Sequence, residues 1–199
     1  KPQHEIKSVF PSCLYITHKK TPLSLSELED IKKEYSSQNS YIFNTNSLLT
    51  NLKEFCEEHI NIYVNEVISP KEKLDFYITQ SWLNVTRPGE SHHKHSHPNS
   101  IISGVFYVST VEDDKITFGD PNAKTRGALK ISLGEYHMWN SSSWYFPVVN
   151  GDLVLFPSWL SHKVERNEKA TKDRLSLSFN TFVKGSLGSA ETLSELILS

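Results

Sequence analysis

The decapeptide from Ser91 to Ser100, SHHKHSHPNS, places four histidines within six residues. If the segment is extended, alternate side chains lie on the same side, so His93, His95 and His97 would point in one direction. Imidazole nitrogens are common ligands of transition metals, and this spacing therefore predicts a metal site. A histidine-rich polar loop without a fixed site is the alternative, because the decapeptide alone cannot decide between the two.

Three features elsewhere in the chain support the metal site. A Pro-Gly turn that ends at Gly89 follows a strand-like segment, so the histidines begin where a strand ends, and such loops often carry function. The segment VVNGDLVLFPSWLSHKV is a strand followed by a turn and then His162. The segment RLSLSFN places Arg174, Ser176 and Asn180 on one face of a strand, and an inward-facing arginine in an apolar barrel requires an anion.

The elements that must position these residues change in type along the chain. Apolar residues at helical spacing predict a helix in residues 24–35, where Ser24 and Glu27 form a capping box, and a longer one in residues 46–68. After Pro70, short segments rich in β-branched and aromatic residues alternate with turn signals. We expect strands in residues 74–86, 101–109, 115–120, 128–133, 144–149, 152–158 and 174–183.

Strands at short spacing with no helices between them predict a mainly β fold. They favour a sandwich, barrel or jelly roll over a parallel α/β sheet. The tail SAETLSELILS is interpreted as a short C-terminal helix. We therefore expect residues 1–199 to form one domain, with an N-terminal strand and supporting helices in 1–70, a β core in 71–183 and a helix in 184–199.

Composition bounds the location and the partners of the chain. The formal net charge is -2 at pH 7, and no run of lysine and arginine exceeds two residues, so nothing indicates binding to nucleic acid. Cys13 and Cys56 are too few for a disulfide framework, and no apolar run approaches the length of a membrane span. We expect a cytoplasmic protein with no membrane partner.

In its motifs HSHPNSIISGVFYV, GDLVLFPSWLSHKV and RLSLSFN, the chain resembles the Fe(II) and 2-oxoglutarate-dependent oxygenases. The resemblance is greatest to a narrower group of these oxygenases from bacteria and their viruses, and it covers roughly residues 75 to 183. It implies a double-stranded β-helix, a jelly roll of the cupin type, flanked by the N-terminal helices and the C-terminal helix. It also implies Fe(II) as cofactor and 2-oxoglutarate as cosubstrate.

Carried over to this chain, the motifs of the family assign a role to each polar residue. The first metal ligand becomes His95, the second His97 and the third His162, so that His92 and His93 are neighbours and not ligands. Arg174 corresponds to the arginine that binds the distal carboxylate of 2-oxoglutarate, and Ser176 is placed to add a hydroxyl donor. By the same resemblance, Asn84 and Asn180 are expected as further cosubstrate contacts.

His97 departs from the usual pattern, since the position normally holds an aspartate or glutamate. A neutral third ligand leaves more positive charge on the metal, and this puts the identity of the metal in question. With three protein ligands, the resemblance implies hydroxylation of an unactivated C–H bond, with dioxygen consumed and succinate and carbon dioxide formed. The prime substrate, a peptide or a small molecule, and the oligomeric state are not given by the sequence.

Two other functions compete with this hypothesis. The stretch GESHHKHSH also satisfies the opening of a cupin motif, which would give a three-histidine metalloenzyme that needs no 2-oxo acid. The second alternative is a jelly-roll protein without enzymatic activity, in which the histidines hold a structural metal.

The segment from Tyr136 to Phe146 is rich in aromatic residues with three serines between them. It is interpreted either as a substrate-gripping loop or lid, or as an edge hairpin whose aromatic side chains pack on the core.

Overall fold

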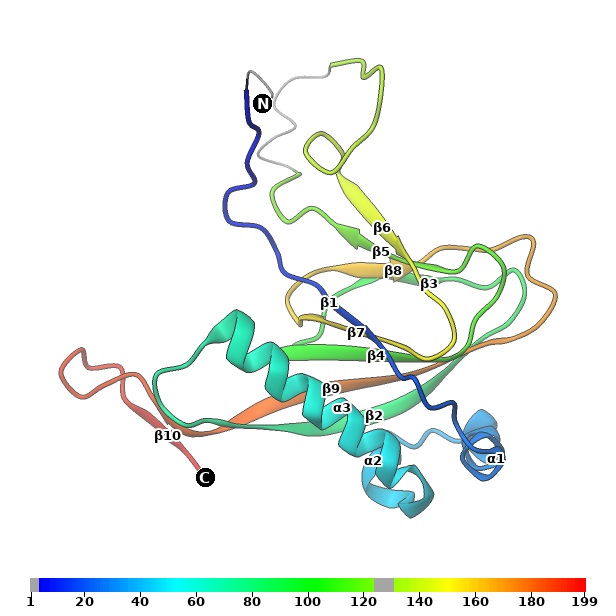
Figure 1. Cartoon of the computed structure of the whole chain (residues 1–199), viewed down its shortest axis with the longest axis horizontal. Coiled ribbons are helices and arrows are strands. Elements are labelled where there is room, and N and C mark those ends of the chain that lie inside the picture. The colour runs from blue at the N-terminus through cyan, green and yellow to red at the C-terminus, as the bar shows by residue number, and fades with distance from the viewer. Residues whose placement is uncertain (1–3, 124–130) are drawn as a thin grey trace.

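Two antiparallel sheets face each other in the computed structural model, which describes residues 4–123 and 131–199 (Figure 1). The larger sheet has the order β1 (Tyr15–His18), β7 (Asp152–Pro157), β4 (Ile102–Ser109), β9 (Arg174–Leu187) and β10 (Leu196–Leu198), and β2 (Asp75–Thr86) also pairs with β9. The smaller sheet has the order β3 (His92–His95), β8 (His162–Val164), β5 (Lys115–Gly119) and β6 (Ser143–Pro147). The predicted mainly β jelly roll is confirmed.

The helices lie in the N-terminal part of the chain. They are α1 (Leu25–Lys33), the 3-10 turns η1 (Glu34–Ser36) and η2 (Ser47–Leu49), α2 (Ile42–Thr45), and α3 (Thr50–Tyr63), which continues into a π-helical turn, η3 (Val64–Ile68). The predicted capping box is confirmed at the start of α1, where the Ser24 hydroxyl accepts from the Glu27 backbone N–H and the Glu27 carboxylate accepts from the Ser24 backbone N–H.

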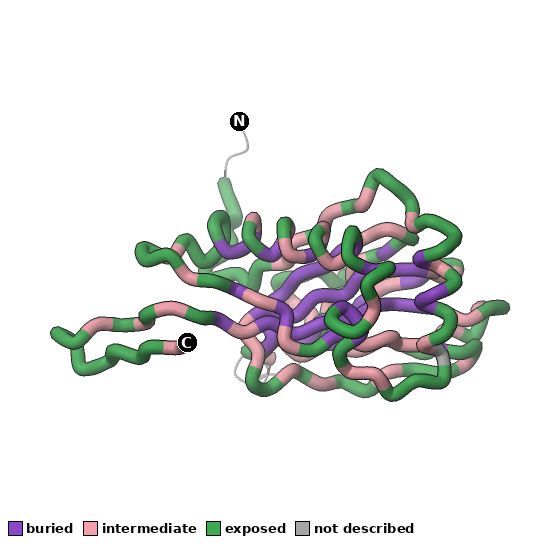
Figure 2. The backbone as a smooth tube through the Cα atoms, turned by 90° about the horizontal axis from the view of Figure 1, so that it is seen from below, coloured by how far each residue is buried: buried purple, intermediate pink, exposed green. Residues whose placement is uncertain are grey.

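The long helix α3 covers the outer face of the larger sheet, where it contacts β2 and β7 (Figure 1). Its apolar stripe, Leu52, Cys56, Ile60 and Tyr63, is buried, as the period of the sequence predicts. Figure 2 shows the buried residues concentrated in the central strands beneath the helices. This helix and the larger sheet therefore enclose the main hydrophobic core.

Strand β9 separates this core from the space between the two sheets. Leu175, Leu177 and Phe179 belong to the core under the helices. Because side chains alternate along a strand, Arg174 and Ser176 point to the opposite side, between the sheets. A second core fills that space beside them, with Val105, Tyr107, Ile116, Phe118, Val148, Val154, Phe156 and Leu160.

The short C-terminal helix predicted for residues 184–199 is wrong. Residues 184–187 continue β9, and β10 pairs with this extension, with Leu196 opposite Leu187. Leu193 is 96% exposed and Ile197 is 72% exposed, so little of this tail packs on the core, and such packing is the main source of stability for a short helix. The open edge of β9 instead offers backbone hydrogen bonds to an extended chain.

Other predicted boundaries also shift. The N-terminal strand is confirmed as β1, at residues 15–18. Of the strand expected at 128–133, residues 128–130 lie outside the described residues, and residues 131–133 form no strand. The histidine decapeptide, expected as a loop or an extended segment, contains the strand β3.

The aromatic segment 136–146 divides between the two interpretations. Its C-terminal part is the edge strand β6, and Phe146 packs against the second core. Tyr136 and Trp139 remain largely exposed, and the Trp139 indole N–H donates to the Ser8 hydroxyl at 3.2 Å.

Among the described residues, no helix has the length and apolar composition needed to cross a membrane.

Candidate active site

Strand pairing in the smaller sheet brings the predicted histidines together. His95 of β3 lies directly opposite His162 of β8 in the antiparallel register, and their ring centroids are 4.4 Å apart. His97 follows β3, and its backbone N–H donates to the Ser158 carbonyl at 2.9 Å, which holds it beside the same pair. One nitrogen of each ring lies within 4.8 Å of the others, so the predicted grouping of His95, His97 and His162 is confirmed as a cluster.

Backbone carbonyls fix the orientation of two of the three rings. The Nδ1 atom of His95 lies 2.8 Å from the His93 carbonyl, and that of His162 lies 3.2 Å from the Leu160 carbonyl. A neutral histidine that donates through Nδ1 presents Nε2 as a lone-pair donor, which is the arrangement found in metal-ligating histidines. The side-chain positions therefore favour ligation through Nε2.

The nitrogens of the cluster fit a divalent transition metal ion. The Nε2 atoms of His97 and His162 face each other at 3.3 Å. Ligand nitrogens lie about 2.1 Å from such an ion, so two ligands at right angles are about 3.0 Å apart. Three neutral nitrogens on one side of the ion would leave its other side open to small ligands.

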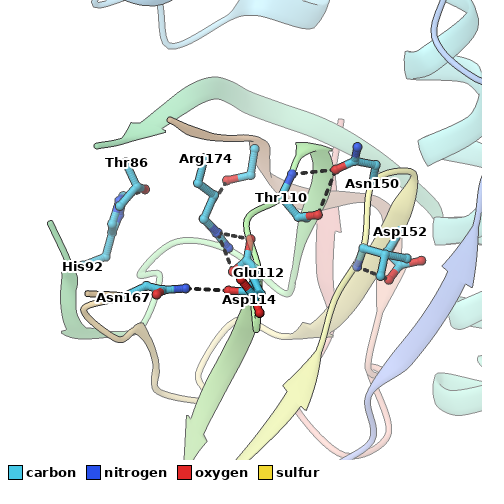
Figure 3. Close-up of polar contacts among 11 residues, drawn as sticks. Thr86, His92, Thr110, Glu112, Asp114, Asn150, Asp152, Asn167 and Arg174 are labelled. Atoms are coloured by element: carbon cyan, nitrogen blue, oxygen red, sulfur yellow. Dashed lines mark hydrogen bonds and ion pairs between the residues drawn. The ribbon is translucent and has the colours of Figure 1, made fainter. Parts of the chain in front are cut away.

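A β-bulge decides which other histidine faces the cavity. The register of β3 against β8 shifts between His92 and His95, so that both side chains line the cavity although they are three residues apart. His93, expected to point the same way as His95 and His97, does not line the cavity and is exposed. His92 is held by Thr86, with His92 Nε2 and Thr86 Oγ1 2.7 Å apart (Figure 3).

A narrow cavity between the sheets joins the histidine cluster to Arg174. Its histidine end is lined by His95, His97 and His162, and its far end by Arg174 and Ser176. Trp82 and Asn84 of β2, Ser178 of β9 and Tyr107 of β4 line the wall between the two ends. Strand β9 pairs with β2 along one edge and with β4 along the other. Ser176 therefore has Asn84 opposite it in β2 and Tyr107 opposite it in β4.

The three remaining polar residues predicted for the site occupy different places. Ser176 lies at the cavity floor, where its hydroxyl is 3.4 Å from Arg174 Nη1. Asn84 lines the cavity, and its amide donates to the Ser178 hydroxyl at 2.7 Å. Asn180 does not line the cavity: its side-chain oxygen accepts from the Ser103 hydroxyl at 3.0 Å, and its amide group also hydrogen-bonds His97.

Arg174 is buried, and it has an anionic partner that the sequence gives no reason to expect. Its Nε atom lies 2.9 Å and 2.8 Å from the two carboxylate oxygens of Asp114, which is also buried (Figure 3). The guanidinium carbon lies 5.0 Å from the centre of the Tyr107 ring. In the sequence, Asp114 follows Glu112 and Asp113 in an exposed-looking acidic run, so nothing sets it apart.

Burial makes His97 and His162 hard to protonate. Burial, together with the neighbouring His95, lowers the pKa of His97 from 6.5 to about 4. Burial also lowers the pKa of His162 to about 4, and a hydrogen bond to the Leu160 backbone opposes this shift. Both rings are therefore neutral near pH 7, which is the form that binds metal.

These pKa values predict how the metal-free protein responds to acid. Unfolded histidine takes up a proton near pH 6.5, whereas folded His162 does so only near pH 4. The contribution of His162 to the free energy of unfolding is therefore complete above pH 6.5 and is lost as the pH decreases towards 4. We expect the urea midpoint, measured with a chelator present, to decrease through this window. The variant His162→Asn should show a shallower decrease, and an equal decrease in both proteins would contradict the assignment.

A family model described as "Putative 2OG-Fe(II) oxygenase" matches residues 80–180, a stretch that contains the three clustered histidines and Arg174. No curated protein matches the chain.

Several solved structures share the fold. One is a Pseudomonas putida prolyl-4-hydroxylase, 14% identical, with a TM-score of 0.57 and coverage of 85% of this chain and 86% of that chain. HygX from Streptomyces hygroscopicus, with nickel and 2-oxoglutarate bound, is 13% identical, with a TM-score of 0.54 and coverage of 85% and 81%. The non-heme alpha ketoglutarate dependent epimerase SnoN from nogalamycin biosynthesis is 12% identical, with a TM-score of 0.55 and coverage of 78% and 70%.

Proposed function

The chain belongs to the 2OG-Fe(II) oxygenases, and from this premise we propose that it is a hydroxylase of an unactivated C–H bond in a peptide or a small molecule. As a member of this family it is an oxidoreductase that uses Fe(II), 2-oxoglutarate and dioxygen. The observation that carries the proposal is the single cavity that joins three convergent histidine nitrogens to a buried arginine.

In this proposal His95, His97 and His162 hold the metal. Their support is the convergence of three imidazoles, two of them oriented by backbone carbonyls. Trp82 stacks on His97 with ring centroids 5.8 Å apart, and Asn180 hydrogen-bonds the same ring. We infer that Trp82 and Asn180 keep His97 in place, so Asn180 would act through His97 more than through the cosubstrate.

Arg174 and Ser176 bind the distal carboxylate of 2-oxoglutarate in this proposal, because a planar guanidinium and a hydroxyl together match a carboxylate. Asn84 adds a polar group midway along the cavity. The buried Tyr107 hydroxyl lies beside Arg174, so a carboxylate bound there would give it a hydrogen-bond acceptor.

Fe(II), when bound with 2-oxoglutarate, supplies the chemistry in which dioxygen oxidises the 2-oxo acid to succinate and carbon dioxide and gives its second oxygen atom to the substrate. The residues of the chain bind and orient these reactants and exclude water. The buried aromatic residues Phe118 and Phe156 pack against His162, with ring centroids 6.1 Å and 4.6 Å away, and close the inner side of the site.

The test is an anaerobic titration of metal-free protein with Fe(II) and then with 2-oxoglutarate. We expect the weak visible charge-transfer band of a chelated 2-oxo acid, followed by succinate formation when air is admitted. Metal uptake without the band would contradict the cosubstrate site and favour a three-histidine cupin enzyme or a structural metal site.

Hydroxylation is tested separately from cosubstrate turnover. Peptide and small-molecule candidates are screened for those that stimulate succinate formation, and mass spectrometry of the product then shows whether one oxygen atom has been added. A product of unchanged mass, as an epimerisation would give, would contradict the hydroxylase proposal and leave the oxygenase family membership intact.

A further inference from the structure

The ion pair of Arg174 with Asp114 joins the two sheets at one end of the cavity. Arg174 begins β9 of the larger sheet, whereas Asp114 directly precedes β5 of the smaller sheet. Both side chains are nearly inaccessible to solvent, with 5% exposed for Arg174 and 4% for Asp114. Such a buried pair keeps a fixed geometry, because moving either partner would leave a buried charge unpaired.

Backbone hydrogen bonds hold Asp114 from both sides. Its N–H donates to the Val111 carbonyl at 3.3 Å in a tight turn, and its carbonyl accepts from the Val148 N–H at 3.1 Å. The carboxylate is therefore presented from a rigid position at the start of a strand. Neither bond uses the side chain, so the carboxylate is free to bind Arg174.

The contact uses only one edge of the guanidinium. Both carboxylate oxygens of Asp114 lie against the Nε–H of Arg174, and Nη1 donates to the Ser176 hydroxyl at 3.4 Å. A guanidinium has five N–H groups, so most of those on its two terminal nitrogens remain available. The Tyr107 ring lies under the guanidinium and restricts its tilt.

We propose that Asp114 is a positioning residue of the cosubstrate site, which holds the Nε edge of Arg174 so that the terminal N–H groups face the distal carboxylate of 2-oxoglutarate. This inference rests on the function proposed above. Asp114 would then contribute to selectivity for a dicarboxylate, because a 2-oxo acid without the distal carboxylate makes no contact with Arg174. Replacing residues that orient metal ligands typically changes affinity by about 10- to 100-fold, and we expect an effect of the same order for Asp114.

The experiment compares two 2-oxo acids of equal chain length, 2-oxoglutarate and 2-oxopentanoate, which lacks the distal carboxylate. Calorimetry on anaerobic, Fe(II)-loaded protein gives both Kd values. The Kd of 2-oxopentanoate divided by the Kd of 2-oxoglutarate measures the selectivity for that carboxylate. In Asp114→Asn we expect the ratio to fall by at least about tenfold, with the Kd values of Fe(II) and 2-oxopentanoate unchanged. The matched control is Asp113→Asn, since Asp113 is in the same turn but pairs with Lys169 at the surface.

Each outcome of this comparison either supports or overturns the positioning role of Asp114. A ratio that is unchanged, or that rises because Asp114 competes with the cosubstrate for Arg174, overturns the positioning role. A loss of Fe(II), 2-oxopentanoate and 2-oxoglutarate binding together indicates a general structural defect and also overturns it. If Asp114→Asn does not fold, Asp114→Glu decides by the same ratio, because it keeps the charge but displaces the carboxylate by one methylene group.

The two proposals fail in different ways. If the wild-type protein binds Fe(II) but not 2-oxoglutarate, the proposed function is wrong. If the wild-type protein binds both and the ratio does not fall in the Asp114 variant, only the positioning role is wrong.

Discussion

Replacing Arg174 with methionine is expected to abolish measurable 2-oxoglutarate binding while Fe(II) still binds. Truncating one partner of a buried, hydrogen-bonded charge pair costs about 2 to 5 kcal/mol, which corresponds to roughly 30- to 5,000-fold in Kd. The measurement is the anaerobic visible band in the presence of Fe(II), with the bound metal determined in parallel. A band of wild-type intensity, at the 2-oxoglutarate concentration that gives the band in the wild-type protein, would contradict the assignment of Arg174.

The variant needs a control for stability, because it leaves Asp114 without its partner. An unpaired buried carboxylate is expected to lower the free energy of unfolding by about 3 to 5 kcal/mol. The double variant Arg174→Met with Asp114→Leu replaces the pair by apolar side chains, and we expect it to regain most of that stability but none of the 2-oxoglutarate binding. Stability and binding are thereby separated.

The second large effect is expected from His162→Ala, which should weaken Fe(II) binding by more than about 100-fold, since even outer-shell substitutions at metal sites cost 10- to 100-fold. Succinate formation should be lost together with the metal. Equilibrium competition with a chromophoric chelator measures the affinity. The matched control is His93→Ala, because His93 is exposed, its ring does not line the cavity, and the hydrogen bond that orients His95 uses its backbone carbonyl, which alanine keeps.

His97 is tested in the same way with a pair of substitutions. His97→Ala should lose metal affinity, whereas His97→Asp should retain it, because a carboxylate at this position recreates the usual facial triad. Retention of affinity in His97→Ala would mean that His97 lies beside the metal without binding it.

The sequence predicts which residues line the site better than it predicts which residues hold them in place. The period-2 alternation of RLSLSFN is enough to put Arg174 and Ser176 on the face opposite Leu175 and Leu177, and the structure confirms this. The grouping of His95, His97 and His162 is also confirmed, although their role as ligands stays a prediction.

What the sequence does not predict depends on how separate segments pack. The bulge in β3 puts His92 in the cavity in place of His93, and regular alternation cannot reveal an inserted residue. Asp114 reaches Arg174 only because the two sheets face each other, and no local pattern encodes that approach. The C-terminal helix is wrong for the same reason, since the free edge of β9 outweighs the helix propensity of the tail.

The separation of the clustered histidines along the chain has a consequence for folding. His97 and His162 are 65 residues apart, and the paired residues of β2 and β9 are farther apart still. Contacts of such high sequence separation require large loops to close, so they form slowly and late. An unfolded chain offers a metal only the neighbouring histidines from His92 to His97, whereas His162 joins His95 and His97 when β3 pairs with β8. A bound ion would therefore select the completed barrel and slow its opening, which makes metal supply a determinant of how long each molecule survives in the folded state.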